Sequence, residues 1–84
     1  MNKASAIEYL VAQEHLKTQQ IAVFGNSRND LSMFQIPNIY SVTYKTAKPY
    51  LIKIAKDVID DAPSAFVSQG ITDFLNYLNS LEPN

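Results

Sequence analysis

The chain has 84 residues, of which 46% are hydrophobic, and its formal net charge is −1. This length allows one small domain, so we treat residues 1–84 as a single domain. The charge argues against a nucleic-acid binder and against a polybasic protein of the membrane surface. Without cysteine there is no disulfide and no thiolate metal site. Apolar runs of about four residues are too short to cross a bilayer, and no signal-peptide pattern is visible, so we expect a cytoplasmic protein.

The first predicted elements are a helix and a strand. Apolar residues recur at helical spacing in residues 3–17 and predict a helix that Asn2 would cap. Residues 21–24, with the sequence IAVF, have no polar side and are typical of a strand covered on both faces. Gly25 ends this strand, and we expect it to permit a sharp turn with unusual backbone dihedrals.

The middle of the chain predicts a short helix followed by a second strand. Residues 31–34 have a helical pattern, which Asn29 or Asp30 could cap. Residues 39–44, with the sequence IYSVTY, are β-branched and aromatic, so they predict a strand.

The last part of the chain continues the alternation. Pro49 fits the first position of a short helix, and residues 57–60 could form a third strand. A turn with Pro63 precedes a closing helix over residues 64–81, which Gly70 could interrupt. The resulting order, α-β-α-β-α-β-α, predicts an α/β fold with a parallel, partly Rossmann-like sheet of about three strands and flanking helices.

The loop at residues 25–30, with the sequence GNSRND, has two interpretations. It follows a predicted strand and precedes a helix N-terminus, where anions bind favourably. Asn26 and Asp30 add oxygen ligands that hard cations accept. The same residue types are also ordinary in a capped turn, so the loop alone fits both a structural turn and a metal or phosphate site.

Two motifs in this order resemble the haloacid dehalogenase (HAD) superfamily of phosphatases. GNSRNDLSM, residues 25–33, is similar to the motif GDxxND-hydrophobic-x-M of that superfamily. NKASAIEYL, residues 2–10, is similar to its lysine motif and places Lys3 in the lysine position. TAKPYLIKIAKDVI and GITDFLNYL continue the likeness to about Leu78. The resemblance is strongest to capped sugar-phosphate phosphatases and implies a HAD-like version of the predicted sheet.

The resemblance implies a chemistry and a role for each matching residue. Such enzymes use magnesium to hydrolyse phosphate monoesters, here of a phosphorylated small molecule, and an N-terminal aspartate attacks phosphorus. Lys3 would be catalytic, holding that nucleophile and the phosphate, and Asn29 would contact the phosphate. Asn26 occupies a position that binds the metal directly, and Asp30 would support the metal through water and Lys3.

The departures from the pattern weaken the expected activity. The chain has no DxDxT or DxDxV segment after an apolar strand, so the nucleophile and the general acid are missing. Asn26 offers a neutral oxygen where the superfamily has an anion, and magnesium prefers carboxylates. We therefore expect the chain to resemble the C-terminal half of a phosphatase, with weak or absent magnesium binding and no activity alone.

The missing half also suggests a partner. In the resembled fold, the strand at residues 21–24 lies beside the strand that carries the nucleophile, so here one strand edge would stay unpaired. We expect a second copy of the chain, or a separate chain with the missing N-terminal half, to cover it. A non-catalytic homodimeric interaction module that degenerated from a phosphatase is the alternative function. An unrelated anion-binding α/β domain, such as a receiver-like domain, ranks last because the N-terminal acidic cluster of receiver domains is absent.

Overall fold

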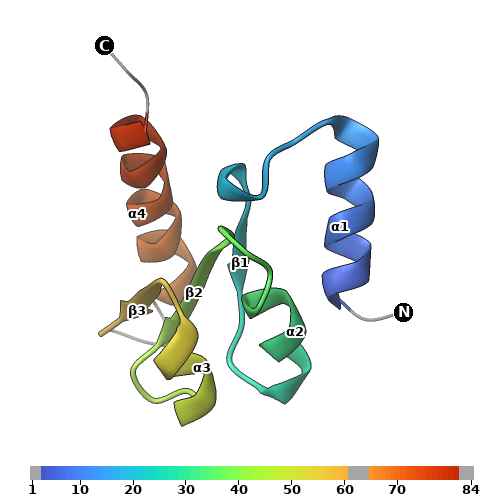
Figure 1. The fold of residues 1–84 in the computed structure, drawn as a ribbon. Coiled ribbons are helices and arrows are strands. Elements are labelled where there is room, and N and C mark those ends of the chain that lie inside the picture. Colours follow the sequence, from blue (N-terminus) through green and yellow to red (C-terminus); the bar gives the residue numbers. More distant parts are fainter. Residues whose placement is uncertain (1–2, 61–64, 82–84) are drawn as a thin grey trace.

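A parallel three-stranded sheet forms the centre of the computed structural model, which describes residues 3–60 and 65–81 (Figure 1). The strands lie in the order β1 (Ala22–Phe24), β2 (Tyr40–Tyr44) and β3 (Asp57–Ile59). Ala22 pairs with Tyr40, and Val42 pairs with Asp57, so β2 is the central strand. β1 and β3 are therefore the two edges of the sheet in the described part of the chain.

Four helices in the described residues cover the two faces of this sheet. They are α1 (Lys3–Glu14), α2 (Leu31–Phe34), α3 (Pro49–Ile54) and α4 (Phe66–Leu81), with single 3₁₀ turns at η1 (Thr18–Gln20) and η2 (Arg28–Asp30). α4 lies on one side of the sheet, whereas α1 and α2 lie on the other (Figure 1). The alternating order of elements and the parallel sheet confirm the predicted α/β architecture.

The sheet separates two hydrophobic clusters, because side chains alternate between the faces of each strand. One cluster joins β1 to α2 and α3 and contains Val23, Met33, Phe34, Ile36, Ile39 and Leu51. The other lies under α4 and contains Tyr40, Val42 and Ile59, packed against Phe66, Phe74 and Tyr77. Burial of these apolar side chains supplies the main force that holds the helices on the sheet.

The predicted first helix is too long by three residues. It ends at Glu14 because His15 takes a left-handed conformation with φ of 57°. The backbone N–H of Leu16 then donates to the carbonyl of Val11 at 3.0 Å, which is the hydrogen bond of a Schellman motif. No glycine or proline marks this position, so the sequence pattern did not reveal the helix end.

The predicted interruption of the last helix at Gly70 is wrong, because α4 runs without a break. A Cβ atom at Gly70 would lie 2.9 Å from Val42 Cγ1 and still closer to the ring of Phe24. The glycine therefore allows the helix to approach the sheet closely. The predicted cap at Asn2 and the predicted turn with Pro63 lie outside the described residues.

Two further features of the described residues are the apolar character of the helices and the exposed hydrophobic side chains of α4. None of the helices there combines the length and the apolar character that a bilayer crossing requires. Several large hydrophobic side chains of α4 remain exposed, namely Val67, Ile71, Leu75 and Leu81.

Candidate functional site

Asp30 is the centre of the loop that follows β1. Its side chain is 7% exposed, and its Oδ1 accepts a hydrogen bond from the Nζ of Lys3, the first described residue of α1. Its Oδ2 accepts the backbone N–H groups of Asn26 at 2.9 Å and of Ser27 at 3.2 Å. The fold thus brings Lys3 and Asp30, 27 positions apart in sequence, into an ion pair at the carboxyl end of the sheet.

The surroundings of Asp30 keep its carboxylate charged. Burial would raise the pKa of Asp30, but the hydrogen bond from Lys3 and those from the N–H groups of Asn26 and Ser27 lower it. The positive charge of Lys3 acts in the same direction, and the net result is a pKa below the usual value of 3.8. At neutral pH this site therefore contains a fixed anion paired with a half-exposed ammonium group.

Gly25 provides the space for this carboxylate. A Cβ atom at position 25 would lie 2.7 Å from Asp30 Oδ2 and closer still to Asp30 Cβ and Cγ. The predicted unusual dihedrals are wrong, since no described glycine has a positive φ. Gly25 is required because the Asp30 side chain folds back over the backbone, and any larger residue would displace it.

The predicted cap of α2 is also corrected. Asp30 directly precedes α2, but its side chain makes no capping hydrogen bond to that helix and points back into the loop. The N–H groups of Asn26 and Ser27, which could have faced an anion, are already bound to Asp30. Asn29 lies in the 3₁₀ turn η2 and is exposed, so its predicted contact with phosphate stays a prediction.

Asn26 lies beside the end of the neighbouring strand. Its side-chain Nδ2 donates to the hydroxyl of Tyr44, the last residue of β2, at 2.9 Å. Tyr44 in turn packs edge-on against the ring of Phe66 in α4 at a centroid distance of 4.9 Å. The amide of Asn26 is thereby held toward β2, while its backbone is held by Asp30.

Comparison with known proteins identifies the family. The sequence profile of haloacid dehalogenase-like hydrolases matches residues 1–71. The chain belongs to this family. It is 34% identical over 77 residues to a Mycoplasma pneumoniae protein named as a candidate phosphatase, covering 92% of this chain and 26% of that protein. It is also 37% identical over 59 residues to an uncharacterised hydrolase of Schizosaccharomyces pombe, covering 68% of this chain and 19% of that protein.

A solved structure agrees with this assignment to the HAD-like hydrolases. The crystal structure of a Thermoplasma acidophilum protein superposes with a TM-score of 0.78 and 27% sequence identity, covering 87% of this chain and 32% of that one. The HAD-like fold expected from the two motifs is therefore confirmed. The chain spans about a quarter and about a fifth of the length of the two curated relatives, 26% and 19%.

The described residues do not fit a magnesium ion by themselves. They contain no group of three or more His, Cys, Asp or Glu side chains that could hold a metal. In the loop, the only carboxylate is that of Asp30, and its two oxygens already accept from Lys3, Asn26 and Ser27. Asn26 adds one neutral amide, whereas magnesium demands six oxygen ligands in near-octahedral geometry. Further ligands would have to come from outside these residues.

Sequence reasoning missed two participants of the site. Ser27 contributes its backbone N–H to Asp30, and Tyr44 binds the side chain of Asn26. Tyr44 could have been found, because the carboxyl ends of adjacent parallel strands meet at one edge of the sheet. The role of Ser27 depends on the path of the loop, which no residue pattern specifies.

Proposed function

We propose that this chain is a portion of a cytoplasmic HAD-like phosphatase that acts on a phosphorylated small molecule. In this proposal the nucleophile comes from a second portion, and the chain alone is inactive. The observation that carries the proposal is the Lys3–Asp30 ion pair at the carboxyl end of β1. Membership of the hydrolase family and the likeness to a candidate phosphatase support the reaction class.

Lys3 is suited to hold a phosphoryl group. An ammonium group has three donors, and in the described part of the chain only Asp30 accepts from it. The side chain of Lys3 is 53% exposed, so the remaining donors can reach a ligand or an incoming carboxylate. Asp30 would act as a positioning residue, because its buried charge fixes the ammonium group at the edge where β1 ends.

The open edge of β1 is where the second portion would join. β1 pairs with β2 alone among the described residues, which leaves its other edge without a partner strand. An unpaired edge next to the Lys3–Asp30 pair can accept a further parallel strand, and ligands in α/β proteins gather where such strands end. A nucleophile at the end of that strand would then face Lys3.

An activity assay and a binding measurement test this proposal. We expect the purified chain to show no hydrolysis of p-nitrophenyl phosphate with magnesium. Inorganic phosphate should nevertheless shift the amide resonances of residues 25–29, and Lys3→Ala should abolish the shifts. Lys53→Ala, which removes an exposed lysine of α3, serves as the control. If the chain alone hydrolysed the substrate and Lys3→Ala or Asp30→Ala removed this activity, the claim that the chain alone is inactive would be wrong. If phosphate left the loop resonances unshifted, the claim of phosphate binding would be wrong.

A homodimeric interaction module is the second candidate function. Besides the open β1 edge, the α4 residues Val67, Ile71 and Leu75 are about half exposed, at 51%, 46% and 53%, and recur every four residues along one stripe of the helix. α4 contains a single charged side chain, Asp73, and low charge with exposed apolar residues favours self-association. Native mass spectrometry separates the two functions: a stable dimer without phosphate binding supports the module, and a monomer rules it out.

A further inference from the structure

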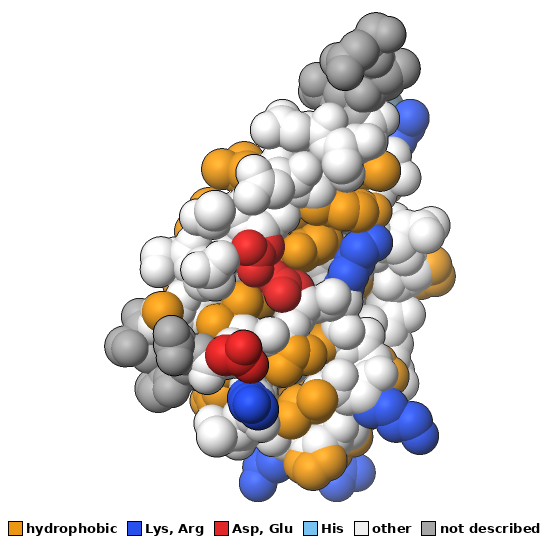
Figure 2. All heavy atoms as spheres, turned by 90° about the vertical axis from the view of Figure 1, so that its left-hand side faces the viewer, with side chains coloured by type: hydrophobic (Ala, Val, Ile, Leu, Met, Phe, Trp, Pro, Cys, Tyr) orange, Lys and Arg blue, Asp and Glu red, His pale blue; other side chains and the backbone are white. Residues whose placement is uncertain are grey.

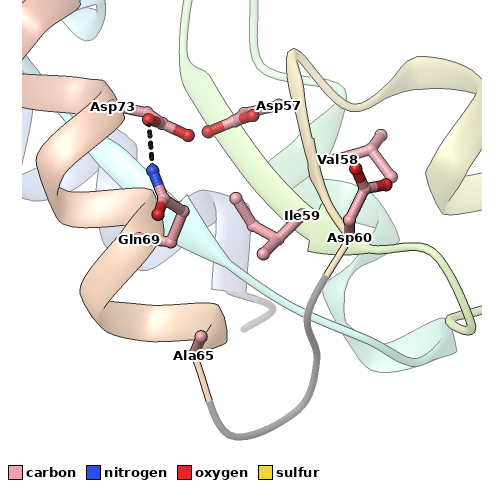
Figure 3. Close-up of a pocket in the computed structure, with 7 residues that line it drawn as sticks. All are labelled: Asp57, Val58, Ile59, Asp60, Ala65, Gln69 and Asp73. Carbon is pink, nitrogen blue, oxygen red and sulfur yellow. Dashed lines mark hydrogen bonds between the residues drawn. The ribbon is translucent and has the colours of Figure 1, made fainter.

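Two carboxyl groups face one another on the side of the molecule opposite α1. Asp57 is the first residue of β3 and Asp73 lies on α4, and Figure 3 shows their carboxyl groups pointing toward each other. The space between β3 and α4 is a pocket of about 320 Å³ lined by Asp57, Val58, Ile59, Asp60, Ala65, Gln69 and Asp73. This pocket lies beside β3, whereas the Lys3–Asp30 pair lies at the end of β1, so the two sites are separate.

Each carboxyl group has a neutral hydrogen-bond donor. The hydroxyl of Tyr40, the first residue of β2, donates to Asp57 Oδ2 at 3.3 Å. The Nε2 of Gln69, one helical turn before Asp73, donates to Asp73 Oδ1 at 2.8 Å. These donors satisfy part of the hydrogen-bonding capacity of the pair without neutralising any charge.

Neither carboxyl group forms an ion pair with a cation in residues 3–60 and 65–81. The neighbouring ammonium group of Lys56 instead donates to the hydroxyl of Tyr77 at 2.9 Å and lies 4.0 Å from the centre of that ring. The other charged side chain that lines the pocket is Asp60, whose oxygen lies 3.8 Å from the nitrogen of Lys45, and both of these side chains are largely exposed. Figure 2 shows this face, where acidic side chains lie among hydrophobic ones.

Two adjacent carboxyl groups without a cation are most stable when they share one proton. Burial, the hydrogen bond with Asp73 and the negative charge of Asp73 together raise the pKa of Asp57 to about 6, against the hydrogen bond from Tyr40, which lowers it. Burial also raises the pKa of Tyr40 to about 12, together with the negative charges of Asp57 and Asp73. The hydroxyl of Tyr40 therefore stays a donor at every pH at which the pair titrates.

We propose that Asp57 and Asp73 form a proton-sharing latch that holds α4 against β3 and loosens when the shared proton is lost. With one proton present, one carboxyl group donates to the other across the pocket. Without it, two like charges face each other in a partly buried space and repel. The rings of Tyr40 and Phe74, 5.2 Å apart, still hold α4 on the sheet, so the change is a local widening beside β3.

The direction of the pH dependence follows from the raised pKa of Asp57. A carboxyl group with a raised pKa stabilises the folded chain fully below its unfolded value of 3.8. That contribution is lost as the pH rises through about 6, the folded-state value. The latch is therefore closed in mild acid and open in mild alkali.

A carboxyl titration by nuclear magnetic resonance tests the latch on the wild-type chain and on Asp73→Asn. We expect Asp57 to titrate near pH 6 in the wild type. In Asp73→Asn the midpoint should fall by roughly one pH unit, because a like charge is replaced by an amide donor. Asp60→Asn is the matched control, since it removes an exposed carboxylate from the same pocket, and it should leave the midpoint of Asp57 unchanged.

Hydrogen exchange separates a local latch from a general loss of stability. After correction for intrinsic rates, the amides of α4 in the wild type should exchange several-fold faster at pH 7.5 than at pH 5, when the amides of β2 serve as the reference. In Asp73→Asn this difference between the two pH values should be absent. A wild-type midpoint for Asp57 within about half a unit of 3.8 would overturn the proposal, and this measurement needs no variant. An α4 exchange rate that does not respond to pH would overturn it as well.

Discussion

Asp30 and Asp57 sit at opposite ends of the same small sheet, and their surroundings act on them in opposite directions. Asp30 follows β1 at its carboxyl end, where an ammonium group and two backbone N–H groups surround it. Asp57 begins β3, where the hydroxyl of Tyr40 donates to it and the carboxyl group of Asp73 faces it. The pKa is lowered for Asp30 and raised to about 6 for Asp57, although burial pushes both upward.

The contrast shows that partners, rather than burial, decide what a partly buried carboxyl group does. The ammonium group of Lys3 and the backbone N–H groups of Asn26 and Ser27 keep Asp30 charged at neutral pH, so that it can orient Lys3. The hydroxyl donor at Asp57 cannot offset burial together with the hydrogen bond and charge of Asp73, so that site responds to pH instead. The first arrangement suits a fixed binding site and the second suits a switch.

Gly25→Ala is the variant with the largest expected effect, because it removes the space on which the Asp30 site depends. The new Cβ would collide with the Asp30 side chain and push it away from both backbone N–H groups. We expect a loss of about 3 kcal/mol in the free energy of unfolding, from steric strain and broken hydrogen bonds to a charged group. Urea denaturation at pH 7 measures this loss.

Thr46→Ala is the control for Gly25→Ala, since it alters an exposed loop residue at the same end of the sheet. Its unfolding free energy should lie within about 0.5 kcal/mol of the wild type. If Gly25→Ala were equally mild, the Asp30 carboxylate would not be fixed over the backbone, and the contrast with Asp57 would lose its basis.

Asp30→Asn is the next largest change and tests the charge at the same position. We expect a loss of about 2 kcal/mol at pH 7, because Lys3 loses its charged partner and the NH2 group of the new amide must face groups that are themselves donors. Since the folded-state pKa of Asp30 is lowered, its contribution exists above 3.8 and disappears as the pH falls further. The deficit should therefore shrink below pH 4, which urea denaturation across pH 3 to 7 would reveal. A deficit independent of pH would contradict a charged Asp30.

The sequence predicted the Asp30 site better than the Asp57 site, for a physical reason. Gly25, Asn26 and Asp30 lie within six consecutive residues at the end of an apolar strand, so a local sequence pattern was enough to predict them. Asp57 and Asp73 are 16 positions apart, and only the packing of α4 on β3 brings them together. The helices were likewise predictable from the spacing of their apolar residues, and the strands from their apolar or β-branched runs.

What the sequence did not predict depends on distances between backbone segments. Gly70 looked like a helix breaker, but its lack of a Cβ atom serves the contact of α4 with Phe24 and Val42. Gly25 was expected for its backbone dihedrals, but it is needed because a Cβ atom there would collide with the side chain of Asp30. The sequence does not show whether a glycine is needed for its backbone conformation or for its lack of a Cβ atom. Only the positions of the neighbouring atoms distinguish these two roles.

Asp57→Asn should have a smaller effect, with the opposite sign to that of Asp30→Asn at high pH. At pH 8 the variant removes one of two facing negative charges, and we expect a gain of up to about 1 kcal/mol, reduced by solvent screening of the partly exposed pair. At pH 5, where the wild type shares a proton, the variant should be no more stable than the wild type. Thermal unfolding at the two pH values measures the difference. A loss of stability at pH 8 as large as that of Asp30→Asn would show that the charge of Asp57 stabilises the fold as the charge of Asp30 does, and would contradict the contrast.

Tyr44→Phe has the smallest expected effect, because it removes one hydrogen bond at the exposed rim of the Asp30 site. The ring contact with Phe66 remains, so the free energy of unfolding should fall by about 0.5 kcal/mol. The side-chain amide resonances of Asn26, by contrast, should shift clearly, since Tyr44 is their only side-chain partner in the described residues. Tyr9→Phe, on the exposed surface of α1, is the control and should leave those resonances in place. Unshifted Asn26 resonances in Tyr44→Phe would mean that β2 does not orient this amide, and that Asp30 alone organises the loop.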